Sequence, residues 1–144
     1  RGAPVARRGF LPAAEAGRLG TTNGAAMRIV PVAIATPAAP LDKFVDNVEE
    51  SCRLTHATSE AIGAAAAVAA AVSAGLEGAG LDAMLEAALQ AAAEGERRGE
   101  PARSGRISER IAEALKLAAR HSGGDGATAI AQQIGTSVSA MQSI

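Results

Sequence analysis

The segment from Thr22 to Pro31 carries the most chemically informative residues of this sequence, because an Asn-Gly pair directly precedes an apolar run that contains one cation, Arg28. Asn23 can accept a hydrogen bond from the first turn of a helix, and Gly24 lets the backbone approach a ligand closely. The N–H groups of that turn would then lie beside Arg28 and favour an anionic or hydroxyl-rich ligand, such as a phosphorylated sugar. The same pattern is also typical of a capped turn in front of a core helix, since Asn-Gly turns are common. Spacing alone leaves both interpretations open.

The composition predicts a helical domain whose core consists of small side chains. Alanine accounts for 37 of the 144 residues and glycine for 16, while Phe10 and Phe44 are the only aromatic residues. Alanine is the strongest helix former, and small side chains let helices approach one another closely. No sustained alternation of polar and apolar residues indicates a strand. The expected fold class is therefore all-α, as a compact multi-helix bundle.

Charge and cysteine content restrict the partners and the location that we expect. The formal net charge is −1, no basic block indicates a nucleic-acid partner, and the absence of Trp and Tyr removes base-stacking side chains. Cys52 is the only cysteine, which excludes an internal disulfide and favours a cytoplasmic location. The uncharged run 61–76 falls short of the roughly 18 to 20 residues of a membrane span. We therefore expect a buried helix there, with neither nucleic acid nor membrane as a partner.

The chain is expected to form one all-α domain over residues 1–144. Residues 1–20 contain prolines and glycines and predict a loop-rich lead-in, whereas residues 21–144 predict a helical region. The sequence starts with Arg1 instead of Met, and residues 137–144 resemble the opening of a further helix. We therefore expect this chain to be a fragment of a larger helical domain.

Helical periodicity locates the elements that must position the Asn-Gly turn. Apolar residues are nearly continuous over 25–35, which predicts burial on all sides, and Pro31 should kink or split this helix. Thr58 or Ser59 is expected to cap the long alanine-rich helix, which should end near Glu77. Together with that helix, further helices are expected over residues 41–52, 81–96, 107–121 and 127–134.

Periodicity also assigns inner and solvated sides to the later helices. Leu81 and Ala118 fall on the stripes that are expected to face the core. The segment 97–106 contains four arginines and is expected to be a solvated loop. Either Gly123 or Gly124 should end the helix that is expected over residues 107–121.

Two segments taken together resemble a known family. Residues 23–29 read Asn-Gly-Ala-Ala-Met-Arg-Ile, and about thirty residues later residues 51–56 read Ser-Cys-Arg-Leu-Thr-His, followed by the alanine-rich helix. This order and spacing resemble the ADP-ribosylglycohydrolase family, which includes the hydrolases that remove ADP-ribose from modified arginine on dinitrogenase reductase. The resemblance is close over roughly residues 20–76 and looser over the later helices.

The resemblance implies a helical domain with a dinuclear magnesium site and a cleft for ADP-ribose. Carried onto this sequence, it implies that Asn23 and Gly24 contact the ribose and phosphates, and that His56 contacts the diphosphate. Both motifs are expected at helix N-termini, where backbone N–H groups attract anions and a histidine can donate a charge-assisted hydrogen bond. Thr22 stands where many relatives carry glycine. The residues expected to support the site are Met27, Arg28 and Thr55.

The metal ligands that the resemblance implies are absent from the sequence. The family supplies them from G-D-x-x-G and T/S-D-D-T segments near the N-terminus and a D-x-D-T segment near the C-terminus, and none of these occurs here. Asp125 is followed by Gly-Ala-Thr instead. In the family, the ions position the ribose and a water for cleavage of the N-glycosidic bond. Magnesium is thus an implied cofactor without ligands in this chain, which we expect to carry no catalytic residue and to be inactive alone.

Three functions remain open at this point. The leading hypothesis is a fragment of an ADP-ribosylglycohydrolase that hydrolyses the bond between ADP-ribose and an acceptor such as arginine. Its partner would be an ADP-ribosylated protein or a small molecule that carries ADP-ribose. The second hypothesis is a non-catalytic helical module that binds ADP-ribose or a related nucleotide. The third is a purely structural bundle in which both motifs only cap helices.

Overall fold

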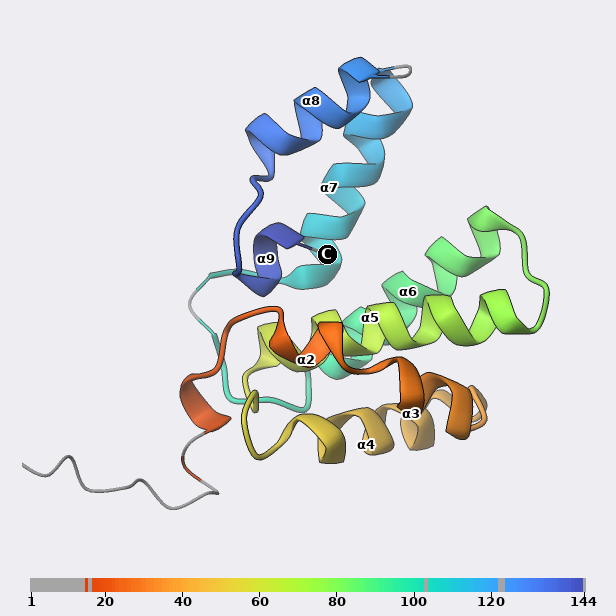
Figure 1. The fold of residues 1–144 in the computed structure, drawn as a ribbon, viewed down its shortest axis with the longest axis vertical. Helices are drawn as coiled ribbons and strands as arrows, with labels where there is room; N and C mark the ends of the chain where they lie inside the picture. The colour runs from red at the N-terminus through yellow and green to blue at the C-terminus, as the bar shows by residue number, and fades with distance from the viewer. Residues whose placement is uncertain (1–14, 16, 103, 122–123, 144) are drawn as a thin grey trace, which may run out of the picture.

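The computed structural model describes residue 15 and residues 17–102, 104–121 and 124–143, and this part of the chain folds into helices joined by short loops (Figure 1). Within these ranges, extended backbone pairs only at two isolated bridges, Thr22 with Ser139 and Thr58 with Glu100. The all-α fold predicted from the sequence is confirmed. The elements are η1 (Gly17–Leu19), α2 (Gly24–Met27), α3 (Val30–Ala35), α4 (Leu41–Cys52), α5 (Ser59–Leu76), α6 (Leu81–Gly95), α7 (Ile107–Arg120), α8 (Gly124–Gln133) and α9 (Ala140–Ser143).

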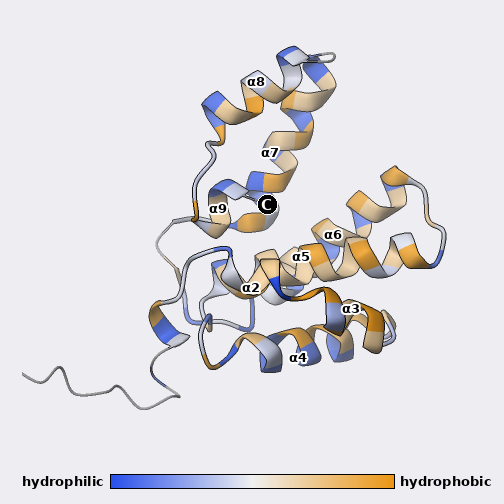
Figure 2. Cartoon of the chain, in the orientation of Figure 1, coloured by the Kyte–Doolittle hydropathy of each residue, from blue (hydrophilic) through white to orange (hydrophobic). Residues whose placement is uncertain are grey.

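The alanine-rich helix α5 is the central element of the fold. It packs against α2, α3, α4, α6, α7 and α9, and its most extensive contact is with α6. Figure 2 shows that α5 is apolar along most of its length, whereas α4 alternates between polar and apolar residues. By length and composition α5 could cross a membrane, but 61% of it is buried inside the protein. The sequence-based expectation of a buried helix is confirmed.

Helices α5 and α6 approach so closely that their contact leaves no room for a side chain at two positions. A Cβ atom added at Gly95 would lie 2.9 Å from the carbonyl oxygen of Ile62 and 3.0 Å from Cβ of Ala66. A Cβ atom at Gly63 would lie 3.2 Å from the carbonyl oxygen of Ala92. Because interiors pack at crystal-like density, this contact fixes the spacing of the two backbones.

Both ends of α5 match the sequence-based predictions. Thr58 is the N-cap residue, and its Oγ1 accepts a hydrogen bond of 3.3 Å from the backbone N–H of Ala61. After the C-cap residue Glu77, Gly78 adopts a φ of 85°, which is the left-handed conformation that glycine favours after a helix. Helix α4 also has the predicted bounds, with its apolar face buried.

The segment 25–35 divides as predicted, but its predicted burial was wrong. Pro31 lies in the first turn of α3, where its missing N–H has no helical partner to lose, and the chain breaks between α2 and α3. Ile29 and Ala33 are buried, whereas Met27 and Ile34 are 75% and 63% exposed. The two short helices lie on the surface of α5, so only their inner side is covered (Figure 1).

Two smaller predictions about the later helices were also wrong, and a third was only partly tested. Leu81 is exposed because the start of α6 diverges from α5 (Figure 1). In α7 the buried position near the C-terminal end is Leu117 and not Ala118, since this part of α7 packs beside α8 alone and not against the central helix (Figure 1). Gly124 begins α8 instead of ending α7, and Gly123 lies outside the described residues.

The contact between α5 and α6 gives a stability prediction with a matched control. Gly95→Ala should lower the free energy of unfolding by about 1–3 kcal/mol, because the added methyl group overpacks a rigid backbone contact. Gly75→Ala should be neutral or should raise it by up to about 1 kcal/mol, because helix propensity improves and only the flexible end of Met84 must move. Urea unfolding followed by far-UV circular dichroism measures both. A Gly95→Ala protein as stable as the wild type would contradict the packing argument.

Candidate functional site

The two motifs recognised in the sequence meet in space. Gly24 at the start of α2 lies directly against His56, which belongs to the loop between α4 and α5. A Cβ atom at Gly24 would lie 2.9 Å from Cε1 and 3.0 Å from Nε2 of the imidazole ring. Only glycine therefore fits beside the histidine, and the two segments form one surface region. We call this region, made of Thr22, Asn23, Gly24, Arg28, Thr55 and His56, the motif junction.

A continuous set of hydrogen bonds holds the motif junction together. Arg28 donates from Nη2 to Oγ1 of Thr55 at 2.6 Å and from Nη1 to the carbonyl oxygen of Gly24 at 3.2 Å. Oγ1 of Thr55 lies 2.8 Å from Nδ1 of His56. On the other side of the ring, Nε2 lies 2.8 Å from Oγ1 of Thr22. Arg28 and Thr55 are therefore linked to His56, and Thr22 is an additional member of the group; a supporting role for Arg28 and Thr55 in ligand binding stays a prediction.

The end of α4 positions the loop that carries His56. The backbone N–H groups of Thr55 and His56 both donate to the carbonyl oxygen of Cys52, at 3.0 and 2.8 Å. The Cys52 side chain is fully buried, and this burial raises the pKa of its thiol to about 11. A thiol with that pKa stays protonated near neutral pH, so Cys52 is a core anchor and not a nucleophile.

The segment around η1 clamps this loop from the other side. The N–H of Ala57 donates to the carbonyl oxygen of Gly17 at 2.7 Å, and the hydroxyl of Thr58 donates to that of Gly20 at 2.6 Å. A Cβ atom at Gly20 would collide with the carbonyl oxygen of Thr55. The geometry of His56 thus depends on backbone contacts to a segment far away in the sequence.

The C-terminal segment supports the turn that contains Asn23. The N–H of Asn23 donates to the carbonyl oxygen of Val138 at 2.8 Å, and the N–H of Ala140 donates to that of Thr21 at 3.0 Å. Ser139, between them, donates a hydrogen bond of 3.3 Å to the carboxylate of Glu60. Sequence analysis did not identify this arrangement, although a carboxylate at the start of a nearly all-apolar helix was a signal.

Glu60 is a buried carboxylate near the first turn of α5. Only 1% of the residue is exposed, and its two oxygens accept hydrogen bonds from the hydroxyls of Ser104 and Ser139. A buried carboxylate is tolerated when its oxygens are hydrogen-bonded, and here these bonds join three separate segments. Glu60 therefore ties the loop after α6 and the segment before α9 to the central helix.

The structure does not favour anion binding by the helix N-terminus at either motif. Asn23 makes no side-chain cap, and α2 has only four residues, which is too short for an appreciable dipole. At the start of α5, the N–H of Ser59 donates to the carbonyl oxygen of Glu100 at 2.8 Å, and Gly99 packs directly on Ser59. The helix end is therefore covered by the loop after α6. The Asn23 amide, which does not cap a helix, is left available for a ligand.

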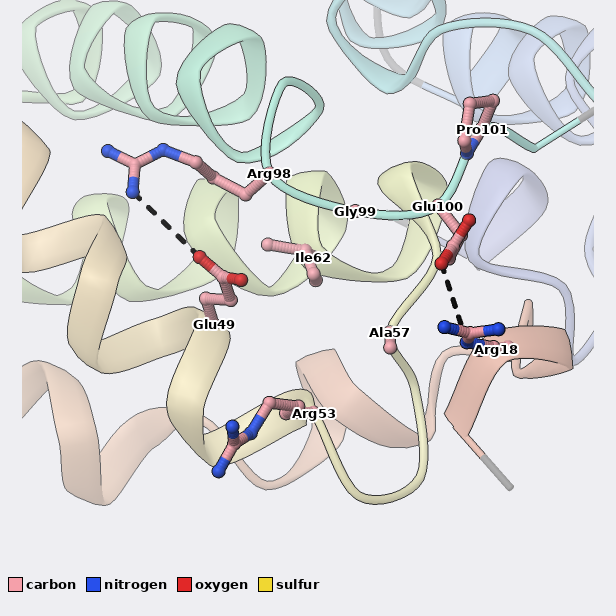
Figure 3. A pocket seen from close by; sticks show the side chains of 9 residues that line it. All are labelled: Arg18, Glu49, Arg53, Ala57, Ile62, Arg98, Gly99, Glu100 and Pro101. Carbon is pink, nitrogen blue, oxygen red and sulfur yellow. Dashed lines mark ion pairs between the residues drawn. The ribbon is translucent and has the colours of Figure 1, made fainter. Parts of the chain in front are cut away.

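A cleft of about 400 Å³ lies on the neighbouring side of the same loop (Figure 3). Arg53 and Ala57 line it, but none of the residues of the motif junction does. Its three arginines are paired within the protein: Arg18 with Glu100 at 3.5 Å, Arg53 with Glu50 at 2.9 Å and Arg98 with Glu49 at 3.8 Å. The complete lining consists of Arg18, Glu49, Arg53, Ala57, Ile62, Arg98, Gly99, Glu100 and Pro101.

Arg98 corrects the expectation of a solvated arginine loop. Its side chain is only 23% exposed, pairs with Glu94 of α6 at 2.8 Å and also pairs with Asp46 of α4. Because these carboxylates already surround the guanidinium, the cleft offers little unbalanced positive charge for a ligand. Arg98 joins α4 to α6, and we place the candidate site at the motif junction instead.

Comparison with known proteins identifies the family of this chain. The chain matches the model of the ADP-ribosylglycohydrolase family over residues 3–144. The chain belongs to this family. It is also 41% identical over 54 residues to the uncharacterized protein YegU of Escherichia coli (strain K12), a stretch that covers 38% of this chain and 16% of YegU. No solved structure matches. The family predicted from the two motifs is confirmed, and its helical fold agrees with the structure.

The environment of His56 in this member of the ADP-ribosylglycohydrolase family favours the neutral form of the imidazole ring. Burial, with a further contribution from the nearby Arg28 cation, lowers the pKa of His56 below its usual value of 6.5. Near neutral pH the ring therefore has one N–H donor and one acceptor nitrogen. The charge-assisted hydrogen bond that was expected from a protonated His56 is not favoured by this environment.

The described residues do not fit the magnesium ions that the resemblance implies. In the ranges 17–102, 104–121 and 124–143, no group of three His, Cys, Asp or Glu side chains could hold a metal ion. The buried carboxylate of Glu60 is engaged by two serine hydroxyls and not by a second carboxylate. We therefore derive no catalytic step through a metal, and Mg²⁺ stays an expectation from the family.

The lowered pKa of His56 predicts how stability depends on pH. Above its usual pKa, both the folded and the unfolded protein hold a neutral His56. As the pH falls from about 6.5 through the lowered folded-state pKa, the unfolded state binds more protons, so stability decreases. In a His121→Gln background, which leaves one histidine, urea unfolding between about pH 7 and pH 5 should show this decrease. The further change His56→Gln should reduce the slope, and an unchanged slope would contradict the prediction.

Proposed function

We propose that this chain binds the ADP-ribose part of its substrate at the motif junction. We further propose that it serves an enzyme that hydrolyses the N-glycosidic bond between ADP-ribose and an acceptor such as arginine. The observation that carries this proposal is the direct contact between Gly24 and His56, two residues from separate family motifs. A pair of motifs that only capped two helices would not need this contact. The side chain of Asn23 makes no cap hydrogen bond, and the N-cap residue of α5 is Thr58 and not His56.

The side chains of the motif junction suit a ligand that carries hydroxyls and phosphates. The Asn23 amide offers both a donor and an acceptor for ribose hydroxyls. Gly24 lets the imidazole ring of His56 pack against the backbone of α2, because no side chain stands between them. The exposed Arg28 places a permanent positive charge beside that backbone, which favours a diphosphate. Contact of Asn23, Gly24 and His56 with the ligand is a prediction.

Cleavage of the N-glycosidic bond is the second half of the proposal, and it requires metal ligands in addition to a binding site. Bound metal ions would supply Lewis-acid activation and orientation of the ribose. The family segments that supply their ligands do not occur in this sequence. We therefore propose that the 144-residue chain binds ADP-ribose but does not cleave it alone. The alternative function, a non-catalytic module that binds ADP-ribose or a related nucleotide, is favoured by the same lack of ligand segments. The partner is either an ADP-ribosylated protein or a small molecule that carries ADP-ribose.

A thermal melt with and without ADP-ribose tests the binding proposal. A ligand present at one hundred times its dissociation constant should add about 2.7 kcal/mol to the free energy of unfolding, which corresponds to a shift of several degrees. Asn23→Ala should weaken binding about tenfold, because one or two hydrogen bonds to the ligand are lost.

Asn47 provides a matched control for that experiment. It lies exposed on α4, and its side-chain amide donates within its own helix to the carbonyl oxygen of Lys43 at 3.1 Å. Asn47→Ala should leave the ADP-ribose shift unchanged. A wild-type melt that does not respond to ADP-ribose would count against the proposed function, and equal losses in both variants would count against the site.

A further inference from the structure

Arg28 fixes the direction of the first hydrogen bond in the group around His56, and the tautomer of the ring sets the direction of the other two. A guanidinium only donates, so Oγ1 of Thr55 accepts from Arg28 at 2.6 Å and keeps its own hydrogen for another partner. The nearest ring nitrogen, Nδ1 of His56, lies 2.8 Å from that oxygen and can accept this hydrogen. In this arrangement Thr55 accepts from Arg28 and donates to the imidazole ring; with the hydrogen on Nδ1, Thr55 would accept from both.

A neutral imidazole ring that accepts a hydrogen bond from Thr55 donates one to Thr22. If Nδ1 accepts from Thr55, the single ring hydrogen lies on Nε2. Nε2 is 2.8 Å from Oγ1 of Thr22 and then donates to it. The hydroxyl hydrogen of Thr22, on an exposed side chain, is left to point away from the ring. The relay Arg28–Thr55–His56–Thr22 thus ends in an outward donor.

Thr22 lies where a bound ligand would meet this donor. Its Oγ1 is 3.6 Å from the position of a Cβ atom at Gly24, so the hydroxyl lies beside the same turn, on a residue exposed to solvent. By contrast, both ring nitrogens of His56 already face threonine oxygens at 2.8 Å. A phosphate could reach His56 only by displacing one of these threonines.

We propose that Thr22 is a ligand-binding residue that donates its hydroxyl hydrogen to a phosphate oxygen of ADP-ribose, and that His56 is its positioning residue. This inference rests on the proposed function, because the ligand is the same. It differs from the expectation based on family resemblance, in which His56 itself contacts the diphosphate. Arg28 contributes twice, as the origin of the relay and as the charge that favours an anionic acceptor.

The position of the ring hydrogen tests the relay without any ligand. In a ¹⁵N-labelled His121→Gln protein, which retains one imidazole, long-range ¹H–¹⁵N correlation spectra in alkaline buffer distinguish the two tautomers. The relay requires the hydrogen on Nε2. A hydrogen on Nδ1 would overturn the proposal, because Nε2 would then accept from Thr22 and consume the hydrogen that the ligand needs.

Titration of three variants with ADP-ribose tests the role of Thr22. Thr22→Val keeps the shape and removes the hydroxyl, and it should weaken binding about tenfold to a hundredfold, as expected for a hydrogen bond to a charged group. Thr22→Ser keeps the hydroxyl and should retain most of the affinity. The adjacent Thr21→Val is the control and should bind as the wild type does. Thr22 pairs with Ser139 through its backbone, so these exposed changes should leave the circular-dichroism melt intact.

A double-mutant cycle distinguishes positioning by His56 from direct contact. If His56 acts through Thr22, His56→Ala should weaken binding in the wild-type background and add little to Thr22→Val. If His56 binds the phosphate directly, the two losses should multiply, and the positioning role would be overturned. Thr22→Val with wild-type affinity would overturn the inference but leave the proposed function standing. A wild-type chain that does not bind ADP-ribose would overturn both.

Discussion

The close contact between α5 and α6 is the constraint on which the rest of this structure depends. Glycine at positions 63 and 95 brings the two backbones together, and alanines fill the remaining contact. Because the core contains few bulky side chains, its stability depends on many short-range contacts that require close approach. The alanine-rich composition is thus a structural requirement of this fold, and α5 becomes the fixed element against which the other helices are placed.

The motif junction depends on this fixed helix through its N-terminal end. Thr58 caps α5 and also donates to Gly20, so one side chain sets the start of the helix and the position of the segment before α2. Glu60, in the first turn of the same helix, attaches the segment before α9. The segments at residues 17–24, 52–58 and 137–140 therefore converge at one end of α5. A ligand site at this end lies on the surface, but the packed core holds its residues in place.

The chemistry of the motif junction differs from a simple anion site at a helix end. Backbone N–H groups at the start of α5 are covered by the loop after α6, and α2 is too short to act as a dipole. In the proposed relay, the direction of the hydrogen bonds attracts the anionic ligand instead of a helix end. Arg28 can only donate, and burial favours the neutral form of His56. The side chains thereby present a donor at a chosen position, which a helix dipole cannot do with the same specificity. The phosphorylated sugar proposed above as the ligand carries the anionic acceptors that suit such a donor.

The sequence by itself determined the features that depend on neighbours along the chain. The bounds of α4, the cap at Thr58, the left-handed Gly78 and the break at Pro31 all follow from local propensity and periodicity. The two short motifs were also sufficient to identify the family, because their order and spacing are a linear property. The resemblance could propose which residues belong to the candidate site, but the spacing of these residues along the chain could not predict the geometry of the site.

Tertiary structure alone decided which groups face one another. The exposure of Met27 in α2 and of Ile34 in α3 depends on which side of each short helix lies on α5, and periodicity in a nearly all-apolar run has no polar side to indicate it. The hydrogen bond between Thr22 and His56, the burial of Glu60 and the unused cap at Asn23 each require segments that are distant in sequence. Local patterns carry no information about such pairs, because the backbone path between them is set by the packing of the whole core.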